Sequence, residues 1–479
     1  MVDVIILGAG VIGAFIAREI AKYNLDVLVL DKENDVGNVT SMANSAIIHS
    51  GYDPLPHTLK AKFNVLGNKM YDQVAKELDV KFIRTGSMTV ATTKEHLKVL
   101  EDLKQRAFEN GVEVCLLTKK EALEKEPHLN DSILGALYCP TAGIIDPFNL
   151  VVHAMENAID NGVKLKLNEE VIGLKEIPNG IKVITKNNVY EGKVIINATG
   201  VNGDTISHLV SNHNFNIKAR KGEYYVLDHF DDSFLNMPIF PLPSEKGKGI
   251  LMTPTSSHNY LVGPSSEFVD DKDDLSTDSL TLSEVKKQAS LIMKDIPFNM
   301  TIRTFAGNRP TPSTHDFIIK IENKHFINVV GIESPGLASA PAIGKYVVEE
   351  LLSTLINLKE KENYNPNVKK YVHMKELSLE ERNKLIKENP KYGHIICKCE
   401  YISEQEILDT LLRSCPPHSI KALKKRVRAG FGKCQGGMCQ PSVLDILANY
   451  YHIDVLDVNY DDLNTNIIKE ITKAGDDNA

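Results

Sequence analysis

Val4-Ile-Ile-Leu-Gly-Ala-Gly-Val-Ile-Gly13 is the stretch that decides the fold of this chain. An apolar strand at residues 4–7 enters the glycine pattern of Gly8, Gly10 and Gly13, and apolar residues then recur with helical spacing. A second strand ends at Asp31, 18 residues after Gly13. Glycines let the backbone approach a pyrophosphate, the helix N-terminus attracts it, and the carboxylate binds ribose hydroxyls. The stretch therefore predicts a dinucleotide site, rather than a glycine turn that only packs a helix on a strand.

Length and composition set the broad class of protein. The chain has 479 residues, of which 42% are hydrophobic and 25% charged, so we expect a soluble multi-domain protein. Its net charge of −8 argues against broad binding to nucleic acid. The N-terminus lacks a basic region, and its apolar stretch is interrupted by glycine. We therefore expect neither a signal peptide nor a membrane helix, and a cytoplasmic location.

Hydrophobic periodicity organises the rest of the chain. Helical spacing covers residues 58–78 and 94–109, and a strand, turn and helix follow one another over residues 326–352. The predicted strands lie at residues 27–30, 163–167, 181–185, 194–197, 224–227, 250–252 and 260–262. We interpret the later strands as a mainly β substrate domain inserted between segments of the nucleotide domain. Ser378 and Glu381 have capping-box spacing and predict a short helix in the polar stretch that follows.

The glycine pattern fits both NAD and FAD, and two later segments favour FAD. They are Val194-Ile-Ile-Asn-Ala-Thr-Gly-Val-Asn-Gly-Asp204 and Val329-Val-Gly-Ile-Glu-Ser-Pro-Gly-Leu-Ala-Ser339, each a buried strand that enters a turn of small residues. The second turn begins a helix whose positive N-terminus would stabilise an anionic reduced flavin. The alternative is that these two segments are ordinary βα loops that do not contact a flavin. A second glycine fingerprint after a strand is missing from the sequence, so electrons should enter from a small substrate rather than from NAD(P)H.

Four further motifs are Thr40-Ser-Met-Ala-Asn-Ser-Ala-Ile-Ile-His-Ser-Gly-Tyr-Asp53, Gly143-Ile-Ile-Asp-Pro147, Arg220-Lys-Gly-Glu-Tyr-Tyr225 and Gly331-Ile-Glu-Ser-Pro-Gly336. Together they resemble the FAD-dependent glycerol-3-phosphate dehydrogenases and oxidases, members of the D-amino-acid-oxidase-like group. The resemblance covers residues 1 to about 355 and implies oxidation of sn-glycerol 3-phosphate to dihydroxyacetone phosphate. Because 2-hydroxyglutarate oxidases share several motifs, another anionic substrate, L-2-hydroxyglutarate or an amino acid, is the alternative. A further alternative is an electron-transfer protein that does not oxidise small molecules.

The predicted fold class is α/β plus α+β. We expect a Rossmann-type FAD-binding domain with an inserted mainly β substrate domain, followed by a small helical iron-sulfur domain. Residues 1–355 form the oxidoreductase, with FAD-binding segments at about 1–90, 145–210 and 300–355 and a substrate domain at 211–300 with part of 80–145. A connector at 356–392, a 2Fe-2S domain at 393–455 and a tail at 456–479 complete the chain. We predict FAD contacts from Gly8, Gly10, Gly13, Asp31, Lys32, Ser41, Ser45, Val171, Thr199, Gly200, Gly331, Gly336 and Leu337.

Oxidation of a secondary alcohol needs a base for the hydroxyl proton, and His49 is our candidate. In the resembled family a histidine at this position lies near the flavin; a structural role is the alternative. An anionic substrate also needs cations. Arg309 matches the family's Gly-x-Arg-Pro segment, and Lys248 lies in a glycine turn just before a strand. The chain departs from the family at Ser257-His258-Asn259, where relatives tend to have His-Gly-Asn, and at Asn308, which replaces an aliphatic residue; both are candidates for the rim of the substrate pocket.

Two cysteine pairs lie near the C-terminus, Cys397-Lys-Cys399 and Cys434-Gln-Gly-Gly-Met-Cys439. Four thiolates bind an iron-sulfur cluster or zinc, and the C-x-C spacing is unusual for zinc. With Gly430, Gly432, Gly436 and Gly437 leaving N–H groups free to approach sulfur, the pattern is similar to the ferredoxin-like domain first associated with bacterioferritin and predicts a 2Fe-2S cluster. A redox disulfide between Cys434 and Cys439 is a weaker alternative, and we interpret Cys415 as a buried or incidental thiol. Pro441 suits the first turn of a helix over residues 442–450, whose positive end would face the cluster.

Basic residues precede the second cysteine pair: Lys421, Lys424, Lys425, Arg426 and Arg428. Such a run is usually a solvated helix face, and the alternative is a docking site for an acidic electron acceptor. The resemblance implies electron-accepting partner subunits that contact the inner face of the cell membrane, whereas the chain itself shows no anchor.

Overall fold

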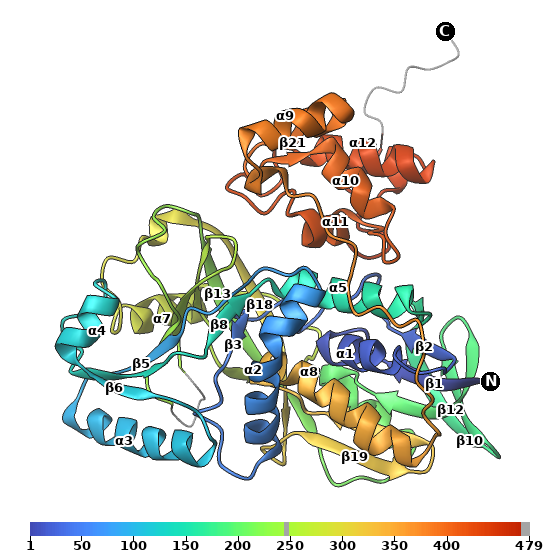
Figure 1. The fold of residues 1–479 in the computed structure, drawn as a ribbon, viewed down its shortest axis with the longest axis horizontal. Helices are drawn as coiled ribbons and strands as arrows, with labels where there is room; N and C mark the ends of the chain where they lie inside the picture. Colours follow the sequence, from blue (N-terminus) through green and yellow to red (C-terminus); the bar gives the residue numbers. More distant parts are fainter. Residues whose placement is uncertain (244–248, 471–479) are drawn as a thin grey trace. The chain divides into compact units, whose positions relative to one another are not determined.

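The computed structural model describes residues 1–243 and 249–470, and it divides into two units. The first comprises Met1–Lys32 and Val36–Val368, and the second comprises Glu33–Asp35 and Lys369–Ala479. Figure 1 shows the course of the chain through each of them. Within the described residues, every helix is too short or too polar to cross a membrane.

A parallel sheet forms the centre of the nucleotide-binding half of the first unit. Its strands run in the order β20 (Phe326–Val330), β12 (Val189–Asn197), β1 (Val2–Leu7), β2 (Val27–Leu30) and β9 (Lys164–Lys166). The antiparallel strands β10 (Val171–Ile177), β11 (Gly180–Thr185) and β19 (Ile318–Asn323) extend it. Parallel strands are buried on both faces, and the apolar residues of β1 and β2 are accordingly almost inaccessible to solvent.

Four helices pack around this sheet. They are α1 (Val11–Ile20), α2 (Leu59–Glu77), α5 (Pro147–Asp160) and α8 (Gly336–Tyr346). Helix α1 contacts α5 and α8, and α8 also packs along α2. Every residue of α1 is buried, as expected for a helix that is apolar around most of its circumference.

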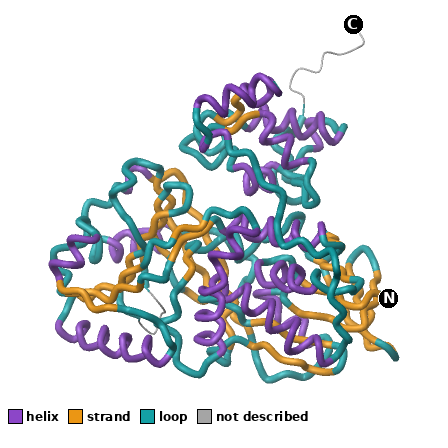
Figure 2. The backbone as a smooth tube through the Cα atoms, viewed as in Figure 1, coloured by secondary structure: helices purple, strands orange, loops and turns teal. Residues whose placement is uncertain are grey.

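A second, mainly antiparallel sheet forms the other half of the first unit (Figure 2). Its strands run in the order β17 (Glu267–Val269), β13 (Ile217–Leu227), β16 (Tyr260–Gly263), β15 (Leu251–Pro254), β14 (Ile239–Phe240), β5 (Ser87–Ala91), β7 (Gly135–Cys139) and β6 (Cys115–Thr118). The long strand β18 (Thr301–Pro312) pairs with β13 along its whole length. Helices α3 (Lys94–Glu109), α4 (Lys119–Lys125) and α7 (Ser279–Ala289) pack on this sheet, whose core is rich in Met, Ile, Leu and Val. Strands β3 (Ile47–Ile48), β8 (Gly143–Ile145) and β4 (Phe82–Ile83) form a small sheet, and α6 (Gly203–His208) follows β12.

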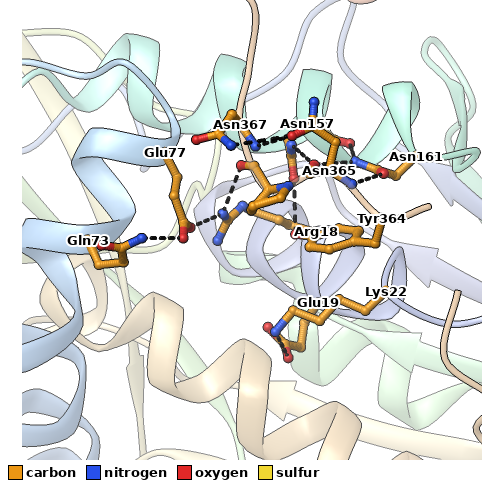
Figure 3. Close-up of polar contacts among 11 residues, drawn as sticks. Arg18, Glu19, Lys22, Gln73, Glu77, Asn157, Asn161, Tyr364, Asn365 and Asn367 are labelled. Carbon is orange, nitrogen blue, oxygen red and sulfur yellow. Dashed lines mark hydrogen bonds and ion pairs between the residues drawn. The ribbon is translucent and has the colours of Figure 1, made fainter. Parts of the chain in front are cut away.

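The end of the first unit is fastened to its helices by polar contacts (Figure 3). Arg18 of α1 pairs with Glu77 of α2 at 2.5 Å and donates to the carbonyl of Pro366 at 3.2 Å. Asn157 and Asn161 of α5 both donate to the carbonyl of Asn365 at 2.9 Å. The first part of the polar stretch after α8 is therefore held against α1, α2 and α5 rather than extended as a free linker.

The second unit is mostly helical (Figure 2). The predicted capping box is confirmed, because Ser378 and Glu381 cap α9 (Leu379–Glu388) reciprocally. Strands β21 (Ile395–Cys397) and β22 (Ile402–Ser403) form a short hairpin, followed by α10 (Glu404–Leu411), α11 (Ile420–Val427) and α12 (Gln440–Tyr451). Apolar residues from all of these elements except α9 form one core, which also contains Cys397 and Cys439.

Candidate functional site

The carboxyl edge of the parallel sheet gathers predicted cofactor residues that are far apart in the sequence. Gly8 follows β1, Asp31 follows β2, Thr199 and Gly200 come shortly after β12, and Gly331 follows β20. Because parallel strands end at the same edge, these residues share one side of the sheet. This is the side on which doubly wound folds bind nucleotides.

The turn after β1 has the geometry of a pyrophosphate cradle. Gly8 has φ +101°, and a Cβ atom there would lie 2.5 Å from the carbonyl oxygen of Ala198, so only glycine fits. The Asp31 carboxylate accepts a hydrogen bond of 2.5 Å from the Ala9 N–H. Helix α1 begins after Gly10 without a side-chain cap or an acidic residue in its first turn. Its positive end is therefore suited to an anion, and the cradle fits the diphosphate of FAD.

The remaining predicted cofactor residues lie around this edge. Ser41 Oγ accepts the N–H of Val11 at 2.9 Å, and Gly13 lies in the first turn of α1. Lys32 pairs with Asp273 at 3.0 Å, and Val171 is the first residue of β10. Gly336 and Leu337 open α8, which also lacks a side-chain cap.

Glu333 is a buried carboxylate that sequence reasoning missed, although its motif was singled out. It pairs with Lys60 at 2.8 Å and Arg220 at 2.6 Å, and accepts from Thr311 at 2.8 Å. Burial alone would raise the pKa of Glu333, but these two cations hold it below its usual range. The ion pairs fix the turn that leads from β20 into α8, because they tie it to α2, β13 and β18.

His49 directly follows the short strand β3 and is half-buried. Its ring lies 5.8 Å from that of Phe240, measured between centroids, and its carbonyl accepts hydrogen bonds from Asn64 and Asn68. Phe240 also packs with Ile47 and Leu251. The predicted cation Lys248 lies outside the described residues.

Ser45 and Arg309, both predicted from the sequence, meet at a third residue, Tyr224. The hydroxyl groups of Tyr224 and Ser45 are 3.0 Å apart, and the Tyr224 ring stacks on Phe305 with centroids 4.6 Å apart. Tyr224 is buried, and Arg309 is close enough to oppose the rise that burial causes in its pKa. The motif around Tyr224 was quoted in the sequence, but nothing there distinguished this tyrosine from Tyr225.

Arg309 is held by backbone carbonyls rather than by acids. Its Nε donates to Arg220 at 3.2 Å, and its Nη2 donates to Ser265 at 2.7 Å. Among the described residues, Arg309 makes no ion pair and Nη1 has no acceptor, whereas its neighbour Arg220 is neutralised by Glu333. Burial lowers the pKa of Arg309, and the carboxylate of Glu333 opposes this shift without forming an ion pair with the guanidinium.

The two departures from the resembled family have other partners in the structure. Asn308 is fully buried on β18, and its amide donates to the carbonyls of Lys272 and Asp274 at 2.9 and 3.0 Å. His258 lies in the turn between β15 and β16 and contacts Asp232 at 2.8 Å. Their proposed position at the rim of the substrate pocket stays a prediction.

The four predicted cluster cysteines come together in the second unit. Sγ atoms of Cys399 and Cys434 are 3.7 Å apart, and Cys397 is hydrogen-bonded to Cys439. Cys397 and Cys439 are buried, whereas Cys399 is exposed. Cys415 is buried elsewhere, as predicted, with Arg426 Nη2 at 3.4 Å from its sulfur. No disulfide joins any of these described cysteines.

Backbone N–H groups surround the sulfur atoms. Contact with Cys439, together with the N–H groups of Gly430 and Glu400, lowers the pKa of Cys397 to about 6. Cβ atoms would not fit at Gly432, where one would lie 2.4 Å from Cβ of Cys399. Helix α12 begins at Cys439 with Pro441 in its first turn, as predicted, so its positive end is at the site. Four adjacent thiols with N–H donors fit an anionic iron-sulfur cluster.

The prediction of a solvated basic face on α11 is wrong. Lys424, Lys425 and Arg426 are buried, and the last two pair with Asp35 at 2.7 and 2.9 Å. These cations hold the pKa of Asp35 well below its usual range, although burial opposes them. Lys421 pairs with Asp461, and Arg428 with Glu400. Four of the five cations are thus paired with carboxylates of the same unit. They do not form the docking face for an acidic acceptor that was considered as the alternative.

Comparison with known proteins identifies the family. The model of FAD dependent oxidoreductases matches residues 3–350. The chain belongs to this family. A second model, the BFD-like 2Fe-2S binding domain, matches residues 395–449 and includes all four predicted cluster cysteines. This FAD dependent oxidoreductase therefore has FAD and a 2Fe-2S cluster as its cofactors.

Relatives of this oxidoreductase differ in how much of the chain they cover. A glycerol 3-phosphate dehydrogenase of Caloramator mitchellensis is 44% identical over 99% of both chains. A glycerol 3-phosphate oxidase of Mycoplasma genitalium is 33% identical, over 76% of this chain and 98% of its own. The solved structure of an FAD-bound L-alpha-glycerophosphate oxidase from Mycoplasma pneumoniae matches with a TM-score of 0.72 and 32% identity, over 77% of this chain and 98% of that one.

Proposed function

We propose that this oxidoreductase converts sn-glycerol 3-phosphate to dihydroxyacetone phosphate and passes the electrons to its 2Fe-2S cluster. His49 accepts the hydroxyl proton, and Arg309 binds the phosphate. Lys248, outside the described residues, is the second proposed cation.

The main support for this proposal is the environment of Arg309. Its guanidinium is positioned by carbonyls and makes no ion pair with any described residue, while burial lowers its pKa. A doubly charged phosphate would form an ion pair with this guanidinium and accept a hydrogen bond from Nη1. The relatives at 44% and 33% identity are a glycerol 3-phosphate dehydrogenase and a glycerol 3-phosphate oxidase, which favours this substrate over a dicarboxylate or an amino acid.

Each proposed role follows from the chemistry of a side chain. The neutral imidazole of His49 is a base whose ordinary pKa is close to neutrality. Tyr224 and Ser45, joined by a 3.0 Å hydrogen bond, orient the substrate beside Arg309. When bound, FAD accepts a hydride from the carbon that bears the hydroxyl. When bound, the cluster transfers single electrons, which suits a one-electron acceptor in a partner protein.

Anaerobic mixing of the holoenzyme with sn-glycerol 3-phosphate tests the proposal. We expect loss of both the flavin and the cluster absorption bands, and no comparable change with L-2-hydroxyglutarate. Arg309→Gln should raise KM for glycerol 3-phosphate by roughly a hundredfold, since a charged hydrogen bond is worth about 1.5–3 kcal/mol. His49→Gln should lower kcat by about 10²–10⁴-fold with little change in KM. Reduction by dithionite but not by glycerol 3-phosphate would overturn the assigned substrate and leave the cofactors in place.

A further inference from the structure

Two loops of the substrate half bring two histidines and an aspartate together. His229 and Asp232 follow β13, and His258 lies in the turn between β15 and β16. Strands β13 and β16 are antiparallel neighbours, with Leu227 opposite Tyr260. The loop that leaves β13 and the turn that enters β16 therefore emerge at the same end of the sheet.

The three side chains converge on one carboxylate oxygen. Oδ1 of Asp232 lies 3.2 Å from Nε2 of His229 and 2.8 Å from Nδ1 of His258. The three potential ligand atoms all lie within 4.8 Å of one another. In a tetrahedral zinc site with bonds of about 2.0–2.1 Å, ligand atoms are about 3.3 Å apart. An ion therefore needs only small side-chain movements to enter this arrangement.

The backbone on both sides of the cluster is fixed by other groups. Asn259 donates to the carbonyl of Leu227 at 3.1 Å, and Tyr260 donates to the carbonyl of Asp231. The Asp231 carboxylate accepts from the N–H and hydroxyl of Ser233 at 2.9 and 2.7 Å. These contacts leave Asp232 as the carboxylate that faces the histidines.

His258 adopts a backbone conformation that favours glycine, with φ +68°. A side chain there costs free energy, and it places the His258 ring against Asp232. The side chains of His229, Asp232 and His258 are 54%, 64% and 48% exposed, so an ion would enter directly from solvent and keep a water ligand.

We propose that His229, Asp232 and His258 form a binding site for a divalent transition-metal ion, zinc being the best fit. Imidazole nitrogen selects Zn²⁺ and its neighbours over Mg²⁺ and Ca²⁺, which require mainly oxygen ligands. The ion would join the loop after β13 to the turn before β16, and so stabilise the outer end of the substrate half. It has no part in the oxidation chemistry.

The cluster-loaded holoenzyme, stripped with a mild chelator, should be titrated with Co²⁺ and Zn²⁺. Co²⁺ reports its ligands spectroscopically: nitrogen and oxygen ligands give d–d bands alone, whereas cysteine adds a sulfur charge-transfer band. We expect one equivalent bound without the sulfur band, displacement by Zn²⁺, and a melting temperature that rises with Zn²⁺ concentration.

Three variants separate ligation from backbone effects. Asp232→Asn and His258→Gly should each weaken binding by roughly tenfold or more, because loss of even an outer partner costs about 10–100-fold. His315→Gly is the matched control, since His315 is also exposed and has φ +60° but lies outside the cluster. It should bind Co²⁺ like the unmodified chain. Equal Co²⁺ affinity in all four proteins, or a sulfur band in the unmodified protein, would overturn the proposal.

Discussion

The side-chain amide of Asn68 donates a hydrogen bond of 3.0 Å to the backbone carbonyl of His49. The same amide reaches the carbonyl of Thr141 at 2.9 Å, and its oxygen accepts from Arg84 at 2.9 Å. Asn64, one turn earlier on α2, donates to the same His49 carbonyl at 2.6 Å. Helix α2 therefore fixes the backbone of the proposed base.

We expect Asn68→Ala to lower kcat by about tenfold with KM little changed, because a small displacement of a reacting group is costly. Steady-state kinetics on glycerol 3-phosphate measures this. Asn161→Ala is the control: it removes a 2.9 Å hydrogen bond to Asn365 and should leave kcat unchanged. An equal loss of kcat in both variants would indicate a general loss of structure instead.

Residues 272–274, which we term the strap, make three consecutive ion pairs. Lys272 pairs with Asp204 at 2.7 Å, Asp273 with Lys32 at 3.0 Å and Asp274 with Lys221 at 2.8 Å. Lys32 follows Asp31, and Asp204 follows the turn after β12, so two of the anchors flank predicted FAD contacts. Asn308 also holds the strap, because its side-chain amide donates hydrogen bonds to the carbonyls of Lys272 and Asp274.

Asn308→Leu should therefore release FAD several-fold faster, since two strap carbonyls lose a hydrogen bond worth about 0.5–1.5 kcal/mol each. Stopped-flow flavin fluorescence after dilution measures the rate. Asp273→Asn removes only an exposed ion pair, worth about 0–1 kcal/mol, and should change the rate little. Identical release from Asn308→Leu and the unmodified chain would show that the strap does not retain FAD.

Because of Glu126, we expect the free energy of unfolding to depend on pH. It is fully buried, and burial raises its pKa to about 7 although Asn236 and Met237 donate to it. Between about pH 4.5 and pH 7 the folded state keeps a proton that the unfolded state has lost, so stability falls as pH rises through this window. The loss is about 3 kcal/mol. Denaturant unfolding of Glu126→Gln should show a flatter pH curve than the unmodified chain, and parallel curves would contradict the assignment.

The cysteines allow a matched test of cluster ligation. Cys439→Ser should lose most iron and sulfide, because a thiolate ligand is replaced by a hydroxyl. Cys415→Ser changes a buried cysteine in the same unit whose sulfur lies 3.4 Å from Arg426 and which is not one of the four predicted ligands, so it should keep a full cluster. Iron and labile-sulfide assays on anaerobically purified protein give the answer. Loss of iron in both variants would point to unfolding of the unit rather than to ligation.

Much of the fold follows from local signals in the sequence. The predicted ranges 27–30 and 94–109 coincide with β2 and α3, and the capping box of Ser378 marks the start of α9. The glycine pattern predicts the turn after β1 because its geometry depends on adjacent residues. By contrast, β13 extends over Ile217–Leu227 although only residues 224–227 were predicted, since its register is set by β18.

Features that depend on distant partners could not be predicted from the sequence. Tyr224 lies between Ser45 and Arg309, and no spacing rule connects residues so far apart. Glu333 stood in a recognised motif, but its role depends on Lys60 and Arg220 from other elements. The basic run on α11 was misinterpreted because its ion-pair partner, Asp35, lies 391 residues before Arg426 in the sequence.

That acid has an evolutionary consequence. Asp35 is grouped with residues 369–479, yet it is encoded only four codons after Asp31. A gene fragment ending at Val368 would leave its carboxylate without Lys425 and Arg426, so we expect a lineage that gained or lost the C-terminal module to change position 35 as well. The loop after β2 and the iron-sulfur module are thus expected to evolve together, although most of the gene separates them.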